Sequence, residues 1–266
     1  MHLKGAQQTL LIPLYARALD SRSRHPILGD KMVDEMVKAI DYDFERLKGF
    51  GNRDVLVVRA KRLDEWTRGF LLRNPEAVVL NLGCGLDSRI SRVGPPPTTS
   101  WFDLDYPEVI EERKKFFSDR EGYGMLGASL TATGWIEGIP SDRPAMVVAD
   151  GVLEYLAEEE VGALFNRLTT HFSCGEMAFD VMNSAAIKWG RSELKAKTGA
   201  EHKWAVDDIR VVERLDPKLR VVSILSPFES KELPLRERIA FRAASALPSF
   251  RDAIRLIRCE FGATSS

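Results

Sequence analysis

The segment AVVLNLGCGLDSRI, residues 77–90, joins a strand-like run to a glycine-rich turn. Val78–Leu82 has the character of a strand buried on both faces of a sheet. Gly83, Cys84 and Gly85 follow at once, and glycine lets a chain turn sharply and approach a ligand closely. In parallel sheets, ligands bind beyond the carboxyl ends of the strands. The segment therefore predicts a binding site at the end of a buried parallel strand.

The turn favours a nucleoside ligand over a dinucleotide. A dinucleotide fingerprint needs a third glycine where Ser88 stands. A pyrophosphate also prefers a helix N-terminus without an acid, whereas Asp87 places a carboxylate there. A ligand without phosphate and with a positive sulfonium or amine, such as S-adenosylmethionine, tolerates this acid better. Two alternatives stay open, namely an NAD-dependent oxidoreductase and a turn that binds nothing.

Strands and helices are predicted to alternate after Pro75. The alternation indicates an α/β fold with a mostly parallel sheet. Helices are expected at 107–117, through 161–168 and around 234–246. The predicted strands are 78–82, 99–104, 122–128, 145–149, 177–182, 219–225 and 254–261.

The first 75 residues are predicted to form helices. Leu10–Leu19 has helical apolar spacing, Asp30 is expected to cap a second helix, and Asp54 a third that ends near Pro75. We therefore expect an N-terminal helical lid over residues 1–75. A Rossmann-like domain would follow over 76–266, with a lid insertion at about 183–215.

Asp105 is predicted to bind the ribose of the ligand. It lies 20 residues past Gly85 and immediately precedes a predicted helix. A carboxylate at this position of an α/β fold can accept both ribose hydroxyls. Capping of the following helix is the alternative. Asp150 ends the fourth strand, before Gly151, and is predicted to contact the ligand, with helix capping again as the alternative.

Arg59 lies within the apolar stripe of the helix before Pro75. Its guanidinium keeps its proton, so an inward-facing Arg59 needs an anion. That anion is either a protein carboxylate or the carboxylate of the cofactor's methionine portion. The side chains expected on the opposite, outer side of this helix are Lys61, Asp64, Glu65 and Arg68.

Composition restricts the possible partners. Net charge is −1, from 38 basic and 39 acidic residues, so nothing attracts nucleic acid or anionic lipid. Three cysteines without a Cys-x-x-Cys pattern suit a reducing compartment, and the four histidines show no metal-ligand spacing. No apolar run reaches membrane-spanning length. We expect a cytoplasmic protein with a small-molecule partner, no metal and no membrane, and the oligomeric state stays open.

Five segments together resemble the leucine carboxyl methyltransferase family, and within it the polyketide-synthesis O-methyltransferase branch of the tetracenomycin type. They occur in family order and cover most of the chain to about Phe172. The segments are TLLIPLYARALDSRSRHPILGDKMVDEM, VVRAKRLDEW, VVLNLGCGLDSR, WFDLDYPEVIEERK and RPAMVVADGVLEYL. The resemblance implies a class I S-adenosylmethionine-dependent methyltransferase fold, with a seven-stranded sheet whose last strand is antiparallel.

The resemblance also implies roles for individual residues. Arg59 would hold the methionine carboxylate, Asp105 the ribose, and Asp150 would lie near the methionine amine. Arg17, in the N-terminal lid, would face the active site and meet a substrate carboxylate. The remaining cofactor-binding positions would be Gly83, Cys84, Gly85, Ser129, Leu130 and Gly151.

Two positions depart from the family pattern. Asp150 stands where the family usually has glutamate, and Ser129 stands where it usually has aspartate, just before Leu130. A serine hydroxyl contacts the adenine amine more weakly than a carboxylate does. Ser129 thus supports a further alternative, a relative that binds the cofactor without catalysis.

The methyl acceptor is predicted to be a small, aromatic or polyketide-like molecule. A carboxylate, with a pKa of about 4, is ionised at neutral pH and needs no base, whereas a phenol, with a pKa of about 10, needs one. The sequence contains no convincing base motif, and the one candidate base in the lid is a lone loop histidine, His25. This favours a carboxylate, with a phenol as the alternative. Trp189 and Trp204 are expected to line an aromatic cavity or to pack the lid.

Overall fold

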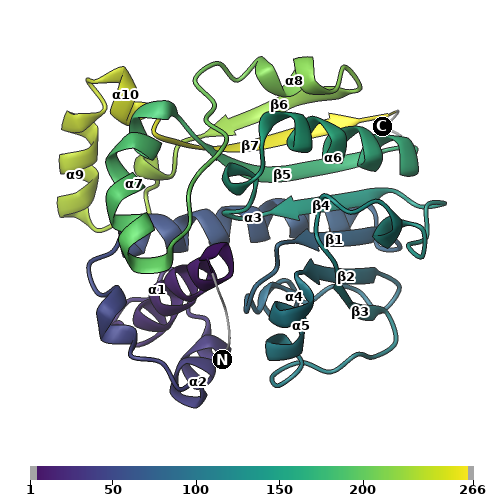
Figure 1. Ribbon diagram of the computed structural model, residues 1–266, viewed down its shortest axis with the longest axis horizontal. Coiled ribbons are helices and arrows are strands. Elements are labelled where there is room, and N and C mark those ends of the chain that lie inside the picture. Colours follow the sequence, from purple (N-terminus) through teal and green to yellow (C-terminus); the bar gives the residue numbers. More distant parts are fainter. Residues whose placement is uncertain (1–4, 263–266) are drawn as a thin grey trace.

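The computed structural model describes residues 5–262 and contains a seven-stranded sheet (Figure 1). The strand order is β3-β2-β1-β4-β5-β7-β6, with β7 antiparallel to both of its neighbours. The predicted seven-stranded sheet with an antiparallel last strand is confirmed. The strands are β1 Val78–Leu82, β2 Ser100–Asp105, β3 Tyr123–Gly127, β4 Ala145–Ala149, β5 Gly175–Met182, β6 Leu219–Leu225 and β7 Ile254–Phe261.

The parallel strands β1, β2 and β4 end at the same edge of the sheet. Leu82 of β1 is in register with Leu104 of β2 and with Ala149 of β4. The residues that follow these three strands are therefore brought together, although they lie far apart in the sequence. This edge contains Gly83 and Asp105, as the sequence predicted.

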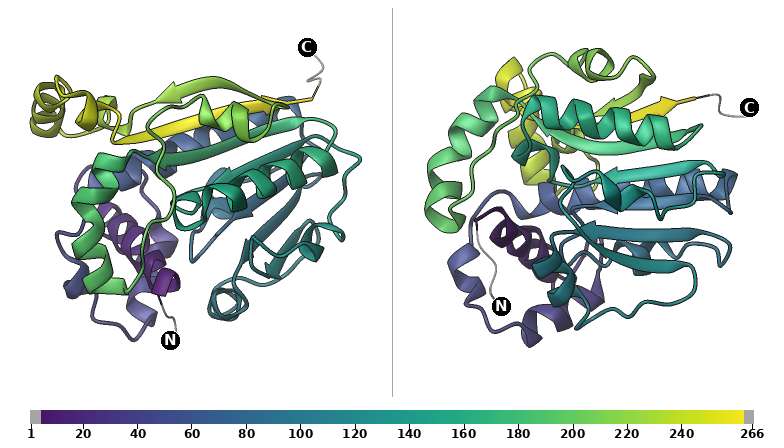
Figure 2. Two further views of the ribbon diagram at one scale, coloured as in Figure 1. Left: turned by 45° about the horizontal axis from the view of Figure 1, so that its top comes forward. Right: turned by 45° about the vertical axis from the view of Figure 1, so that its right-hand side comes forward.

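Helices cover both faces of the sheet (Figure 2). The α-helices are α1 Leu11–Ser21, α2 Lys31–Ala39, α3 Arg53–Arg73, α4 Arg89–Val93, α5 Pro107–Arg113, α6 Glu158–His171, α7 Ser184–Thr198, α8 Val211–Leu215, α9 Leu235–Ala244 and α10 Pro248–Arg251. The short 3-10 helices are η1 Gly5–Leu10, η2 Phe44–Leu47, η3 Gly134–Ile136, η4 Leu153–Tyr155 and η5 Pro227–Glu229.

Each face of the sheet has its own apolar core. On one face, Leu164 and Leu168 of α6 pack with Leu80 of β1. On the other, Leu14 of α1 and Leu63 of α3 belong to the same cluster as Val79 of β1. The N-terminal helices thus share a core with the sheet. The division of the chain into a lid and a Rossmann-like domain stays a prediction.

The helix starts confirm one expected cap and correct another. The Asp30 side chain accepts a hydrogen bond from the Val33 amide at the start of α2, as predicted. The cap of α3 is Asn52, which accepts from the Val55 amide at 2.9 Å, and not Asp54. Asp54 lies in the first turn, where its ion pair with Arg53 holds its side chain.

Two helices after β5, α7 and α8, were not predicted, and α5 ends four residues earlier than expected, at Arg113. The two tryptophans of this region differ in environment. Trp204 is buried and donates to Glu158 at 3.1 Å, so it packs the fold, whereas Trp189 is 59% exposed. Neither of them lines the cavity described below. None of the helices in residues 5–262 has the length and apolar character needed to cross a bilayer.

Candidate active site

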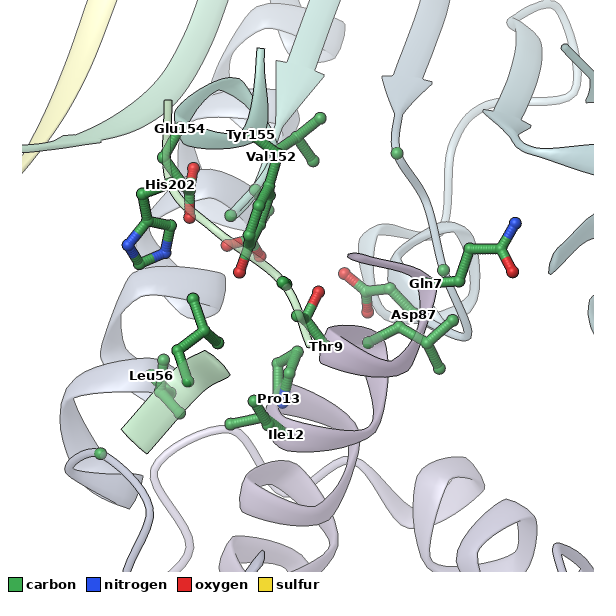
Figure 3. Close-up of a pocket in the computed structure, with 18 of the residues that line it drawn as sticks. Gln7, Thr9, Ile12, Pro13, Leu56, Asp87, Val152, Glu154, Tyr155 and His202 are labelled. Atoms are coloured by element: carbon green, nitrogen blue, oxygen red, sulfur yellow. The ribbon is translucent and has the colours of Figure 1, made fainter. Parts of the chain in front are cut away.

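A cavity of about 740 Å³ opens at the carboxyl ends of β1, β2 and β4. Its size is that of a small-molecule site. One wall is made by the turns after these strands, and the other by η1, α1, α3 and α7. Figure 3 shows Asp87 and Gln7 at one end, Glu154 and His202 at the other, and Thr9 and Tyr155 between them.

The glycine turn after β1 forms part of the cavity wall. Gly83 and Gly85 have φ angles of +59° and +50°, a left-handed conformation that favours glycine. Cys84 between them is buried, and its amide donates to the Leu104 carbonyl of β2 at 3.1 Å. The turn therefore presents backbone instead of side chains to the cavity, as expected.

Asp105 lines the cavity and holds the glycine turn in place. One carboxylate oxygen accepts from the Gly85 amide at 2.8 Å and the other from the Tyr106 amide at 2.7 Å. Each oxygen retains a lone pair for a ligand hydroxyl. Burial raises the pKa of Asp105 to about 6, against the effect of the two amides. The capping alternative does not hold, because α5 has no side-chain cap.

Arg59 faces the cavity, as expected, and is ion-paired with two aspartates. Its Nε lies 2.6 Å from Asp150 and its Nη1 donates to Asp180 at 2.9 Å. Asp180 also accepts from the Gly151 amide at 2.6 Å. Gly151 has a φ of +71°, and a Cβ there would lie 2.8 Å from the Arg59 guanidinium. Glycine at 151 thus leaves room for Arg59. The sequence left open whether Arg59 pairs with a protein carboxylate, and the structure shows two such partners.

Asp150 is also paired with a second arginine. Arg89 of α4 donates to it at 2.8 Å. Burial alone would raise the pKa of Asp150, but the guanidiniums of Arg59 and Arg89 hold it below its ordinary value. Asp150 is therefore ionised and already occupied by two cations, and it does not cap a helix.

Asp87 is surrounded by arginines. Arg92 lies 2.5 Å, Arg89 3.4 Å and Arg17 3.8 Å from its carboxylate. Burial would raise the pKa of Asp87, but these cations hold it well below the ordinary value. Repulsion of a pyrophosphate ligand by Asp87 requires that its carboxylate is an uncompensated negative charge. In the structure three arginines compensate it.

The predicted exposure of Asp64 is wrong. It was predicted on the outer side of its helix, but it is fully buried. Its carboxylate accepts from Arg89 at 2.8 Å and from Arg92 at 2.7 Å. A continuous network of buried ion pairs therefore connects α3 to α4 and reaches the cavity through Arg89.

Arg17 lines the cavity from α1 and is 4% exposed. Its one ion pair within the described chain, to Asp87, is long, and its Nε has no hydrogen-bond partner there. Burial lowers the pKa of Arg17 against the effect of Asp87. Arg17 is thus a buried cation at the cavity wall whose Nε donor has no partner within the described residues.

The structure separates Ser129 from Leu130. Leu130 lines the cavity, together with Ala128, but Ser129 does not. The Ser129 hydroxyl lies 2.8 Å from that of Thr131. Asp180, Glu154 and His202 belong to the site, although the sequence did not single them out. Glu154 stands in the VVADGVLEYL segment, four residues past Asp150, and this nearness was its one sequence signal.

The fold is that of the class I S-adenosylmethionine-dependent methyltransferases. A putative methyltransferase from Thermobifida fusca has a similar fold, with a TM-score of 0.61 at 16% identity, and the match covers 93% of this chain and 94% of that one. The model of the leucine carboxyl methyltransferase family matches residues 11–169. The chain belongs to this family.

Two relatives extend the match beyond residue 169. The tetracenomycin polyketide synthesis O-methyltransferase TcmP of Streptomyces glaucescens is 40% identical over 98% of both chains. The S-adenosyl-L-methionine-dependent methyltransferase dpfgK of Gibberella zeae is 32% identical over 82% of this chain and 81% of its own. The family resemblance seen in the sequence is confirmed.

Proposed function

We propose that this S-adenosylmethionine-dependent O-methyltransferase methylates a carboxylate of a small aromatic acceptor. Arg17 carries the proposal, because a buried guanidinium at the cavity wall whose ion pair with Asp87 is long matches an anionic acceptor. A carboxylate is ionised at neutral pH, so no base is required.

Free cysteines at positions 84, 174 and 259 support a cytoplasmic location.

In our proposal the cofactor occupies the end of the cavity that contains the glycine turn. When bound, S-adenosylmethionine would supply a methyl group on a positive sulfonium: the acceptor oxygen would bond to the methyl carbon as the carbon–sulfur bond breaks, with S-adenosylhomocysteine as the leaving group. In the proposed arrangement Gly83 and Gly85 give the nucleoside close access to backbone, Asp105 accepts from the ribose hydroxyls, and Arg59 turns part of its guanidinium to the methionine carboxylate. Leu130 contributes an apolar contact to adenine.

The chain's own residues would act by alignment and by exclusion of water. Arg17 would fix the acceptor carboxylate, and the apolar side chains Leu10 and Val152 line the same cavity. Opposite charges on acceptor and donor disappear during transfer, so a poorly hydrated cavity favours the reaction. Holding the two reactants together accounts for about 7–11 kcal/mol of barrier reduction in favourable cases.

The Asp105 assignment predicts a pH-dependent cofactor affinity. Ribose hydroxyls donate better to the ionised carboxylate, and the pKa of Asp105 is raised to about 6. The association constant for S-adenosylhomocysteine should therefore fall as pH decreases through 6, by up to about tenfold per unit, and level off above about pH 7. Calorimetric titration from about pH 5 to about pH 8 measures it. The same dependence in Asp105→Asn would contradict the assignment.

The Arg17 assignment predicts a selective loss of acceptor turnover. With 2-naphthoic acid as probe, the product should be the methyl ester, and Arg17→Met should lower kcat/KM by roughly 10- to 150-fold, the scale of a charged hydrogen bond. Arg24→Met, which changes an exposed arginine in the loop after α1, is the control and should retain activity. Methylation of 2-naphthol in preference to 2-naphthoic acid would overturn the proposal.

A further inference from the structure

The end of the cavity remote from Asp87 has apolar sides and a polar end wall. Ile12, Pro13 and Leu56 line its sides, whereas Glu154 and His202 lie together at its far end (Figure 3). In the proposed arrangement the cofactor contacts the glycine turn, Asp105 and Arg59, and the acceptor carboxylate meets Arg17, which lies 3.8 Å from Asp87. An acceptor held there would extend its other end toward Glu154 and His202. The following inference rests on that proposed function.

The backbone fixes His202 beside Glu154. The Glu154 carbonyl accepts from the amides of Lys203 and Trp204 at 2.7 and 3.2 Å. The His202 ring also packs against that of Tyr155, with centroids 5.1 Å apart. The segment after α7 is thus attached to the turn after β4, and the two side chains hold fixed positions.

Each of the two side chains has one buried polar atom without a partner in the described chain. These atoms are Glu154 Oε2 and His202 Nδ1. Glu154 is 5% exposed. A buried polar atom without a hydrogen bond is costly, so two of them in one cavity wall indicate groups that a ligand or water satisfies.

The protonation states of the pair are complementary. Burial and the nearby Asp180 carboxylate together raise the pKa of Glu154 to about 8, against the effect of Arg59. At neutral pH most of the Glu154 carboxyl is therefore protonated and donates. Burial and the Arg191 charge lower the pKa of His202, so the imidazole is neutral. With its proton on Nε2, the imidazole accepts at Nδ1.

A hydroxyl group satisfies such a pair, because it accepts one hydrogen bond and donates another. A ligand carboxylate would be repelled by the Glu154 carboxylate once Glu154 ionises. An apolar group would leave Glu154 Oε2 and His202 Nδ1 without hydrogen bonds. We propose that Glu154 and His202 form an acceptor subsite for a phenolic hydroxyl, so that the acceptor is an aromatic acid whose hydroxyl lies remote from the methylated carboxylate.

The test compares acids that differ by one hydroxyl. Enzyme saturated with S-adenosylhomocysteine is titrated calorimetrically at pH 7 with 2-naphthoic acid and with each of its monohydroxy isomers. At least one isomer should bind about tenfold more tightly than the parent acid, the scale of one buried hydrogen bond. In His202→Phe, which keeps an aromatic ring against Tyr155, this ratio should fall to about one. Glu154→Gln, which can still donate, should retain most of it.

Two controls isolate the subsite. His25→Phe changes an exposed histidine and should leave the ratio unchanged. An affinity ratio near one for all isomers, or a raised ratio that survives in His202→Phe, overturns the subsite. Methyl ether formation at the bound hydroxyl also overturns it, because Glu154 and His202 would then act as a base. Absence of S-adenosylhomocysteine binding would instead overturn the proposed function, and the subsite with it.

Discussion

Replacing Arg113 by methionine is expected to lower the free energy of unfolding by about 3–5 kcal/mol, the cost of removing one partner from a buried ion pair. Arg113 is fully buried and is paired with Asp103 of β2. It also donates to the Gly85 carbonyl at 3.1 Å and to the Asp87 carbonyl at 2.7 Å. Methionine fills similar space but leaves the Asp103 charge buried and both carbonyls without this donor. Urea denaturation monitored by circular dichroism measures the change.

Two further variants make this expectation specific. Arg113→Lys keeps the charge but not the guanidinium fork, in which Nη1 donates to both carbonyls while Nη2 is paired with Asp103, so it should recover only part of the loss. Arg120→Met changes an exposed arginine and should cost less than about 0.5 kcal/mol. Equal destabilisation by Arg113→Met and Arg120→Met would show that the buried pair contributes nothing beyond an exposed charge.

The sequence predicted the sheet well because its strands are short apolar runs bounded by turn residues. The expected bounds of β1, β4, β6 and β7 agree with the structure. Caps were harder, because Asn52 and Asp54 are both good N-cap residues two positions apart. Their competition is decided by where the preceding loop enters the helix, which is a tertiary property.

The cavity position and its glycine turn were also predictable, since parallel strands place their carboxyl ends together. The ion-pair network was not. Asp64 looked solvent-facing because its helical neighbours are charged, but its partner Arg89 is 25 residues away. Asp180 pairs with Arg59 over 121 residues. No local pattern contains such pairs, so charges buried by tertiary contact escape sequence analysis.

Replacing Gly83 by alanine is expected to lower the free energy of unfolding by about 2–5 kcal/mol. A left-handed alanine costs about 1–2 kcal/mol, and overpacking a core site about 1–3 kcal/mol. Gly83 has a φ of +59°, and an added Cβ would lie 2.9 Å from Cγ1 of Val152 and still closer to Cγ2. Valine is stiff about χ1, so it cannot rotate both methyl groups away. Cofactor affinity should fall as well, because the turn lines the cavity.

Gly94 separates the two contributions to this loss. It has a φ of +62°, and nothing lies within 4 Å of an added Cβ, so Gly94→Ala should show the backbone cost alone. Adding Val152→Ala to Gly83→Ala removes the clash and should bring the loss close to that of Gly94→Ala, after the cost of Val152→Ala itself is subtracted. Thermal and urea unfolding of the four variants and of the unchanged protein give the comparison. If Gly83→Ala is no worse than Gly94→Ala, then Val152 does not restrict the turn, and the close approach of the chain after β4 is not what requires glycine at position 83.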